Sequence, residues 1–292
     1  MNDRNTLYRA MSCSIGMILL AFVASAQSVR CTYEYSYKLD PAGEYRSAPD
    51  MRLDYCEGRS AWYSESKYMK DSLSIHAFDE NGSIVDNKVY GQMAQIQSKL
   101  FESTTIDFQN RSFIQHYQTA TIHLNGKGEL IMPAWELLDE EKEIEGYHCH
   151  KATTSYLGRN WTVWYTEEIP LNIGPWLLWG APGLILEAQD ADNLFAFKFT
   201  GAQQFSGIHR FEQLRKFYMV SRSKRREKDY KTDELRIIEN TYTKLRTDVE
   251  FFNEAHGIRT SRVTNASGKE LDQSAYFRYI PLIPTEYWRN NR

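Results

Sequence analysis

The sequence lacks an apolar run long enough to span a membrane as a helix. Residues 15–24 form an apolar stretch of about 10 residues, whereas a membrane span needs about 20. This stretch follows a segment that ends in Arg9 and precedes Ala24-Ser25-Ala26, which has the pattern of a signal-peptidase cleavage site. We therefore expect residues 1–26 to be a signal peptide, no transmembrane anchor after its cleavage, and a periplasmic or secreted mature protein.

The familiar catalytic motifs are also missing. The chain has no G-x-S-x-G nucleophile elbow, no H-E-x-x-H zinc motif, no phosphate-binding P-loop, no C-x-x-C pair and no G-x-G-x-x-G dinucleotide loop. Scattered residues can still build an active site, so catalysis itself is not excluded. We predict no catalytic residues, no cofactor and no metal from motifs alone.

Cysteine is scarce: four are present, and Cys13 lies in the expected signal peptide. Export permits a disulfide, and the odd number that remains leaves one thiol over. A turn-forming segment, residues 40–44, lies midway between Cys31 and Cys56, so a hairpin folded there would bring the two together. We predict a Cys31–Cys56 disulfide, while pairings that involve Cys149 stay open.

Charge and composition restrict the class of protein further. The net charge of −3 argues against nucleic acid as a partner. Aromatic residues make up 14% and hydrophobic residues 42% of the chain, which is enough for a large folded core. The length suits one domain, residues 27–292. The basic run at 221–229 is interpreted as a solvated face rather than a lipid or nucleic-acid patch.

Most of the mature chain has the alternating pattern of β-strands. Tyr33, Tyr35 and Tyr37 alternate with polar residues, and residues 184–190 and 195–200 form a hairpin pattern with one strongly apolar face. Asn81-Gly82 and Asn125-Gly126 are hairpin turn signals. These features predict a meandering antiparallel sheet.

Helical patterns are fewer. Residues 135–144 (WELLDEEKEI) indicate a short acidic helix, and residues 211–252 contain the clearest helical region, interrupted near 221–229. The expected fold class is mainly β (α+β), with a curved antiparallel sheet packed against a helical segment.

The triplet His148-Cys149-His150 is the best candidate for chemistry. On a strand the two histidines share one face, where they could hold zinc or copper if a third ligand were present. The sequence identifies no third ligand, so we interpret the histidines as surface residues. Cys149 points to the opposite face, and we expect it to be buried or disulfide-bonded rather than nucleophilic.

The densest aromatic cluster comprises Trp161, Trp164, Tyr165, Trp176 and Trp179. Such side chains can line a groove for an apolar ligand or simply fill the core between a sheet and its covering helix. Both interpretations stay open from the sequence.

Two of these tryptophans fall in an unusual segment, GPWLLWGAPGLILEAQD. We predict a structural corner that carries the chain from the 161–166 strand onto the 184–189 strand. Its defining residues are Gly174, Pro175, Gly180, Pro182, Gly183, Leu184 and Ile185. The neighbouring carboxylates Glu187 and Asp190 are expected to tolerate replacement by amides.

The same segment resembles the GLPGLI family of exported bacterial proteins, with Gly180-Ala-Pro-Gly-Leu-Ile185 in place of the eponymous hexapeptide. The Gly146-Tyr147 pair, Cys149, Lys151 and Ala152 are similar to its "GYxCxKA" strand, and the similarity covers 144–200. The resemblance implies export but no particular activity. Its sheet-and-helix pattern is similar to that of the periplasmic lipoprotein-carrier half-barrel, an analogy of fold only.

Together these observations favour an exported cell-envelope protein that binds an apolar or peptide-like ligand, or an envelope protein, without catalysis. The alternatives are a hydrolase with an unrecognised active site and a structural or interaction module of the envelope. A cavity lined by the 161–179 aromatics would favour binding. A cleft with convergent groups of perturbed pKa would favour an enzyme.

Overall fold

The structure is a computed structural model that describes residues 28–79, 83–98, 100–119, 122–204, 230–257 and 278–290. Its strands are β1 Val29–Tyr37, β2 Arg46–Cys56, β3 Arg59–Ser64, β4 Ser103–Asp107, β5 Ser112–Gln118, β6 His123–Glu129, β7 Glu136–Ile144, β8 Tyr147–Tyr156, β9 Arg159–Thr166, β10 Leu184–Asp190, β11 Phe195–Gln204 and β12 Tyr230–Glu234. The helices are α1 Glu65–Ala77, α2 Asn87–Gln95, α4 Leu235–Thr247, α5 Val249–Ala255 and α6 Thr285–Asn290.

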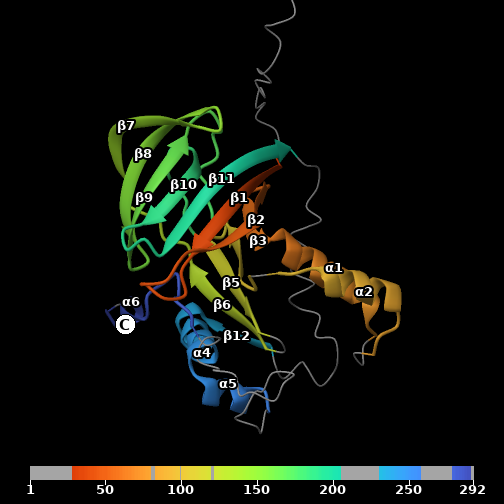
Figure 1. Cartoon of the computed structure of the whole chain (residues 1–292). Coiled ribbons are helices and arrows are strands. Elements are labelled where there is room, and N and C mark those ends of the chain that lie inside the picture. Colours follow the sequence, from red (N-terminus) through yellow and green to blue (C-terminus); the bar gives the residue numbers. More distant parts are fainter. Residues whose placement is uncertain are drawn as a thin grey trace, which may run out of the picture.

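Within these residues the strands form one open sheet of 12 strands, in the order β12-β6-β5-β4-β3-β2-β1-β11-β10-β9-β8-β7 (Figure 1). The sheet consists of two consecutive meanders. One runs from β1 to β6, the other runs from β7 to β11, and the antiparallel pairing of β1 with β11 joins them. Only β12 runs parallel to its neighbour, β6. The predicted mainly β fold is therefore confirmed.

Three hairpins turn at a glycine that follows a residue with positive φ. The pairs are Glu57-Gly58, Glu145-Gly146 and Leu157-Gly158. In each pair the first residue has φ 49°, and the glycines have φ 75°, 83° and 80° respectively. Positive φ at both central residues is characteristic of type I′ turns, whose twist matches that of paired strands. The residues on either side of the Leu157-Gly158 turn form β8 and β9.

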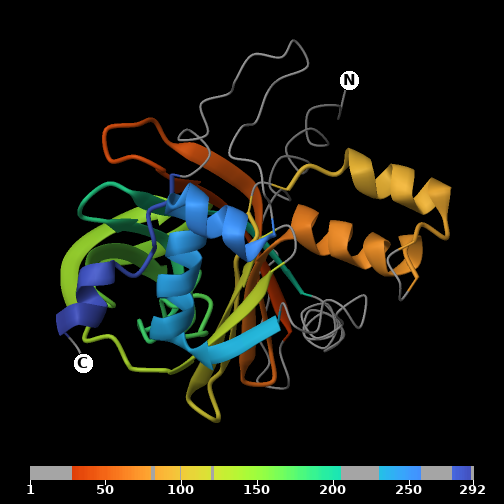
Figure 2. The same ribbon diagram turned by 90° about the horizontal axis from the view of Figure 1, so that it is seen from below.

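The helix α4 packs across β6 and β5 (Figure 2). Its buried residues include Leu235, Ile238 and Tyr242, which join the hydrophobic core. Gly126 lies beneath it, because a Cβ added there would lie 2.6 Å from a Leu235 methyl carbon. The prediction of a turn at Asn125-Gly126 was therefore wrong: the glycine lets a helix approach the middle of a strand.

The segment after β3 forms the helices α1 and α2, which were not predicted from the sequence. Helices α1 and α2 pair with each other and extend to one side of the sheet (Figures 1 and 2). Ser64 caps α1 by accepting a hydrogen bond from the Lys67 N–H, and Asp86 caps α2 in the same way. A short antiparallel bridge between Phe78 and Ile84 closes the connection.

Residues 136–144 form the edge strand β7, so the predicted helix at 135–144 was wrong. The strand pairs with β8, and a register irregularity lies between Leu138 and Glu141. Most of its side chains are exposed, which explains why no alternating apolar face was visible in the sequence. Charged side chains on an edge strand also discourage pairing with other chains.

The predicted Cys31–Cys56 disulfide does not form in the structure, where Cys31, Cys56 and Cys149 are free. The β1–β2 register sets Cys31 opposite Leu53, so Cys56 and Cys31 lie on opposite faces of the sheet. The Cys56 sulfur instead lies 2.9 Å from the Ser28 hydroxyl, which donates a hydrogen bond to it. The hairpin does form, but its register is offset from the one that a disulfide requires.

Three predicted segments lie outside the described residues. These are the signal peptide, residues 1–26, the Asn81-Gly82 turn, and the part of the 211–252 helical region that precedes β12, including the basic run. The remainder of that region forms β12, α4 and α5. Among the described residues, no helix is both long and apolar enough to cross a membrane.

Candidate functional site

A cavity of about 60 Å³ lies between the sheet, α4 and the segment that precedes α6. A water needs roughly 10–15 Å³, and a cavity that binds benzene has about 150 Å³. The space therefore fits a few heavy atoms and is far too small for a lipid chain. Much of its wall is aromatic, contributed by Tyr35, Tyr37, Trp62, Tyr117, Trp176, Phe195 and Tyr279.

Three polar side chains, Glu102, Gln115 and Arg246, also face the cavity. Tyr242 donates a hydrogen bond of 2.8 Å to Glu102 Oε1 and accepts one of 3.3 Å from Arg246 Nη1. Burial raises the pKa of Tyr242 well above its usual value, so this hydroxyl keeps its proton and donates. The carboxylate and the guanidinium are thus held in place by one tyrosine.

Glu239 is the most perturbed carboxyl near the cavity. Burial raises its pKa to about 7, although hydrogen bonds to its carboxylate lower it. The Tyr117 hydroxyl donates to one oxygen over 2.5 Å and Trp288 Nε1 donates to the other over 3.0 Å. Both oxygens are thereby bound by the fold itself, so the group behaves as a buried structural acid.

Of the predicted aromatic cluster, Trp176 reaches the cavity wall. Trp161 is 1% exposed and packs behind it, with ring centroids 5.9 Å apart. The buried Trp161 Nε1 has no hydrogen-bond partner among the described residues. An unsatisfied buried donor costs about 1–3 kcal/mol. Trp161 therefore fills core while leaving one donor unpaired near the cavity wall.

The other three aromatics lie elsewhere. Trp164 is covered by the Lys142 ammonium, 4.4 Å from its ring centroid, and Tyr165 packs beside His150. Trp179 donates from Nε1 to the Ile131 carbonyl oxygen over 3.1 Å. The five predicted residues are thus not one groove: the core-filling interpretation fits most of them, and the cavity uses residues distant in sequence.

The segment 174–183 forms part of the connection between β9 and β10. A Cβ built on Gly183 would lie 1.9 Å from the Thr166 carbonyl oxygen, closer than any real contact. Gly180 has φ +82°, and Trp176 itself has φ +55°. The close approach lets the chain turn back beside Thr166, with Trp176 facing the cavity. This geometry agrees with the corner that the sequence predicts.

Asp190 ends β10 in a buried ion pair with Arg159, at 3.1 Å between oxygen and nitrogen. Its other oxygen accepts hydrogen bonds from the Leu194 and Phe195 N–H groups. Arg159 also donates to the carbonyl oxygens of residues 281 and 282, over 2.8 and 2.7 Å. Asp190 and Arg159 therefore fix a hairpin and one wall of the cavity, a role that the sequence analysis missed.

Cys149 is fully buried on β8, as expected. Burial is the main reason that its pKa is raised to about 11, so the thiol stays protonated near neutral pH. Its strand neighbours His148 and His150 point to the opposite face. A nucleophilic role has no support in this environment.

Comparison with known families now adds to this geometry. A family model described as "N-glycanase peptide, N-terminal domain" matches residues 62–230, more than half of the chain. The chain belongs to this family. The match to the N-glycanase N-terminal-domain family begins within β3 and includes the 174–183 corner. It ends before α4, so the cavity residues Arg246 and Tyr279 lie beyond it.

Two solved structures are similar to the chain, both of PNGF-II, in space groups P21 and C2. The first is 15% identical with a TM-score of 0.49, and the second is 16% identical with a TM-score of 0.48. Each alignment covers 76% of this chain but 34% of the other, so the chain spans about a third of the length of PNGF-II. No curated protein matches the sequence.

Proposed function

We propose that the chain is an exported cell-envelope module that binds a peptide-like ligand without catalysis, by taking one of the ligand's side chains into the cavity. The observation that carries this proposal is the cavity itself, with aromatic walls and the fixed pair Glu102 and Arg246. Binding sites typically combine an apolar wall with a few placed polar groups. Export rests on the signal-peptide pattern of residues 1–26.

The volume supports a side chain rather than a lipid. About 60 Å³ is less than half of a benzene-binding cavity, so an acyl chain does not fit. This restricts the ligand classes expected from the sequence, where apolar and peptide-like ligands were both open. The analogy to lipoprotein carriers likewise extends to the curved sheet and not to a lipid-sized space.

A hydrolase is the second candidate, and the raised pKa of Glu239 is the observation in its favour. Both Glu239 oxygens are already bound by Tyr117 and Trp288. A general acid must reach its substrate within hydrogen-bond distance, and Glu239 does not line the cavity. Because the family match concerns an N-terminal domain, we do not assign N-glycanase activity to this chain. The resemblance of 144–200 to the GLPGLI family stays a proposal and falls within the matched region.

Saturation-transfer NMR tests the proposal with N-acetylleucinamide, N-acetylvalinamide and decanoate as probes. The amides should receive saturation from the protein, and Leu100→Phe should abolish the effect because Leu100 lines the cavity. Leu137→Phe is the matched control, since Leu137 is 54% exposed on β7.

Three outcomes would contradict the proposal. No saturation of either amide, or saturation unchanged in Leu100→Phe, would remove the cavity as the binding site. A preference for decanoate would favour an apolar ligand. Cleavage of an amide probe that is lost in Glu239→Gln would favour the hydrolase.

A further inference from the structure

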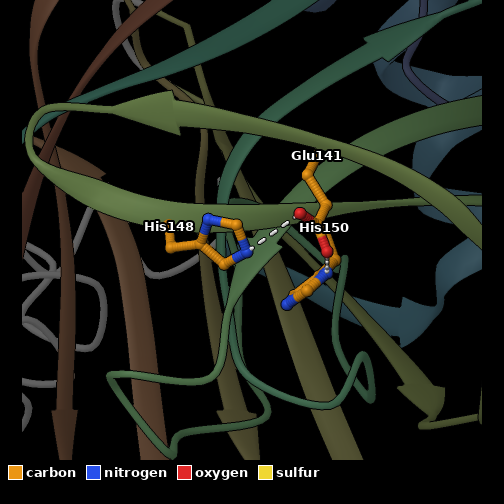
Figure 3. A group of neighbouring side chains, drawn as sticks. All are labelled: Glu141, His148 and His150. Carbon is orange, nitrogen blue, oxygen red and sulfur yellow. Dashed lines mark ion pairs between the residues drawn. The ribbon is translucent and has the colours of Figure 1, made fainter.

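The β7–β8 hairpin, at the edge of the sheet, adds a carboxylate to the two histidines that the sequence had shown as a pair. Glu141 on β7 lies directly opposite His150 on β8, and Glu143 lies opposite His148. Because alternate residues of a strand share a face, Glu141 and the two histidines are on the same side of the hairpin. Figure 3 shows the Glu141 carboxylate reaching both imidazoles.

The separations suit a metal ion. Glu141 Oε2 lies 3.4 Å from His148 Nε2, and Glu141 Oε1 lies 3.5 Å from His150 Nδ1. One ligand atom from each residue falls within 4.8 Å of the others. Around a tetrahedral zinc ion with bonds of about 2.0 Å, neighbouring ligand atoms are about 3.3 Å apart. The three side chains therefore need little movement to surround an ion.

Nearby charges also favour a cation at this position. The segment 136–145 carries six carboxylates and a single lysine, Lys142. That lysine is paired with Glu187, and Lys151 on β8 is paired with Glu140. Both lysines thus have carboxylate partners other than Glu141, so neither takes the place of a metal there. The excess negative charge raises the local concentration of divalent cations.

We propose that Glu141, His148 and His150 form a binding site for a divalent transition-metal ion such as Zn²⁺. Two imidazole nitrogens and a carboxylate are ligands that zinc and copper accept. The side chains of His148 and Glu141 are 56% and 53% exposed, so the remaining coordination positions are open to water or to a donor from another molecule. The site is independent of the proposed ligand cavity.

Isothermal titration of the purified protein with ZnCl₂ tests the site. The protein should bind Zn²⁺, and the variants Glu141→Gln, His148→Ala and His150→Ala should each weaken its affinity by at least about tenfold. Two matched controls should retain this affinity: Glu143→Gln, which removes the same charge two residues further along β7, and His76→Ala, which removes an exposed histidine of α1. Thermal melts verify that each variant is folded.

Electron paramagnetic resonance of the unaltered protein with one equivalent of Cu²⁺ gives an answer that needs no variant. Hyperfine coupling to two imidazole nitrogens is expected. Coupling to none, or Zn²⁺ binding that Glu143→Gln weakens as much as Glu141→Gln, would overturn the proposal and leave only an ion pair between exposed side chains. Absence of Zn²⁺ binding would have the same consequence.

Discussion

Histidine and glutamate have opposite environments at the two ends of this sheet. Near β5 and β6, His116 is buried against Asn125, and burial lowers its pKa to about 4, while burial raises the pKa of Glu239 to about 7. On the β7–β8 hairpin, Glu141 and His148 are about half exposed. Where the fold buries such groups it supplies their partners, which removes them from chemistry; where it leaves them exposed, their ligand atoms stay accessible.

The largest contrast is expected between two glycines. Gly183→Ala places a Cβ 1.9 Å from the Thr166 carbonyl oxygen, so it should lower the free energy of unfolding by at least about 3 kcal/mol. Gly146→Ala, in the hairpin turn with φ +83° and open space around it, should cost only about 1–2 kcal/mol. Urea unfolding of both variants measures the difference. Equal costs would show that the corner can relax.

A second contrast compares two carboxylates of β10. Asp190→Asn removes the buried charge partner of Arg159 and leaves it only the exposed Asp192, 3.6 Å away, so it should cost about 3 kcal/mol or more. Glu187→Gln removes an ion pair with Lys142 that is about one-third exposed, and should cost at most about 1 kcal/mol. The sequence alone suggested that both amides are harmless, and burial changes this for Asp190. Chemical denaturation measures both costs. An Asp190→Asn variant as stable as the wild type would contradict the structural role of Asp190.

The third prediction concerns pH. The folded-state pKa of Glu239 is about 7 against an ordinary value of 4.5, so the folded protein binds the proton more tightly than the unfolded chain. Its contribution to the free energy of unfolding is therefore complete below about pH 4.5 and declines by about 3 kcal/mol as the pH rises to 7. Glu239→Gln should remove this decline.

The contribution of His116 to the free energy of unfolding changes with pH in the opposite direction. Its lowered pKa makes the unfolded chain the better proton binder between about pH 4 and 6.5. The measurement is accordingly the difference in unfolding free energy between wild type and Glu239→Gln at each pH from 4 to 8. The contribution of His116 is the same in both proteins and cancels from this difference. A difference that does not change with pH would show that Glu239 titrates normally.

The smallest effect is expected on the exposed edge strand. Leu137 is 54% exposed, so Leu137→Lys should change the unfolding free energy by no more than about 0.5 kcal/mol. A thermal melt suffices to test this. A larger loss would indicate that another surface covers β7 in solution.

The strands could be predicted from the sequence wherever one face of the strand is buried and the other is exposed to solvent. Tyr33 and Tyr35 of β1 and the phenylalanines of β11 alternate for this reason, and these predictions were right. β7 has little buried face, so its charges were mistaken for a helix. Asn125-Gly126 was mistaken for a turn because only the packing of α4 explains a glycine there.

The candidate sites were harder to predict, because register and long-range packing create them. The cavity combines Tyr35 of β1, Tyr117 of β5 and Arg246 of α4, and no local pattern connects them. His148 and His150 were visible as a pair, but Glu141 joins them only once β7 is a strand in register with β8. The Cys31–Cys56 disulfide failed for the same reason, since a small offset in register reverses which face a residue occupies.

The division of the sheet into two meanders has a consequence for the order of folding. Within each meander, strands that follow one another pair with each other, most of them through short connections, and such local contacts form quickly. The β1–β11 pairing joins residues near the start of the described chain, such as Val29, to residues as distant as Gln204. Closing that loop carries the greater entropic cost, so we expect it to limit the folding rate. Until it closes, each meander exposes an unpaired strand edge, and the nascent protein is then most prone to aggregate.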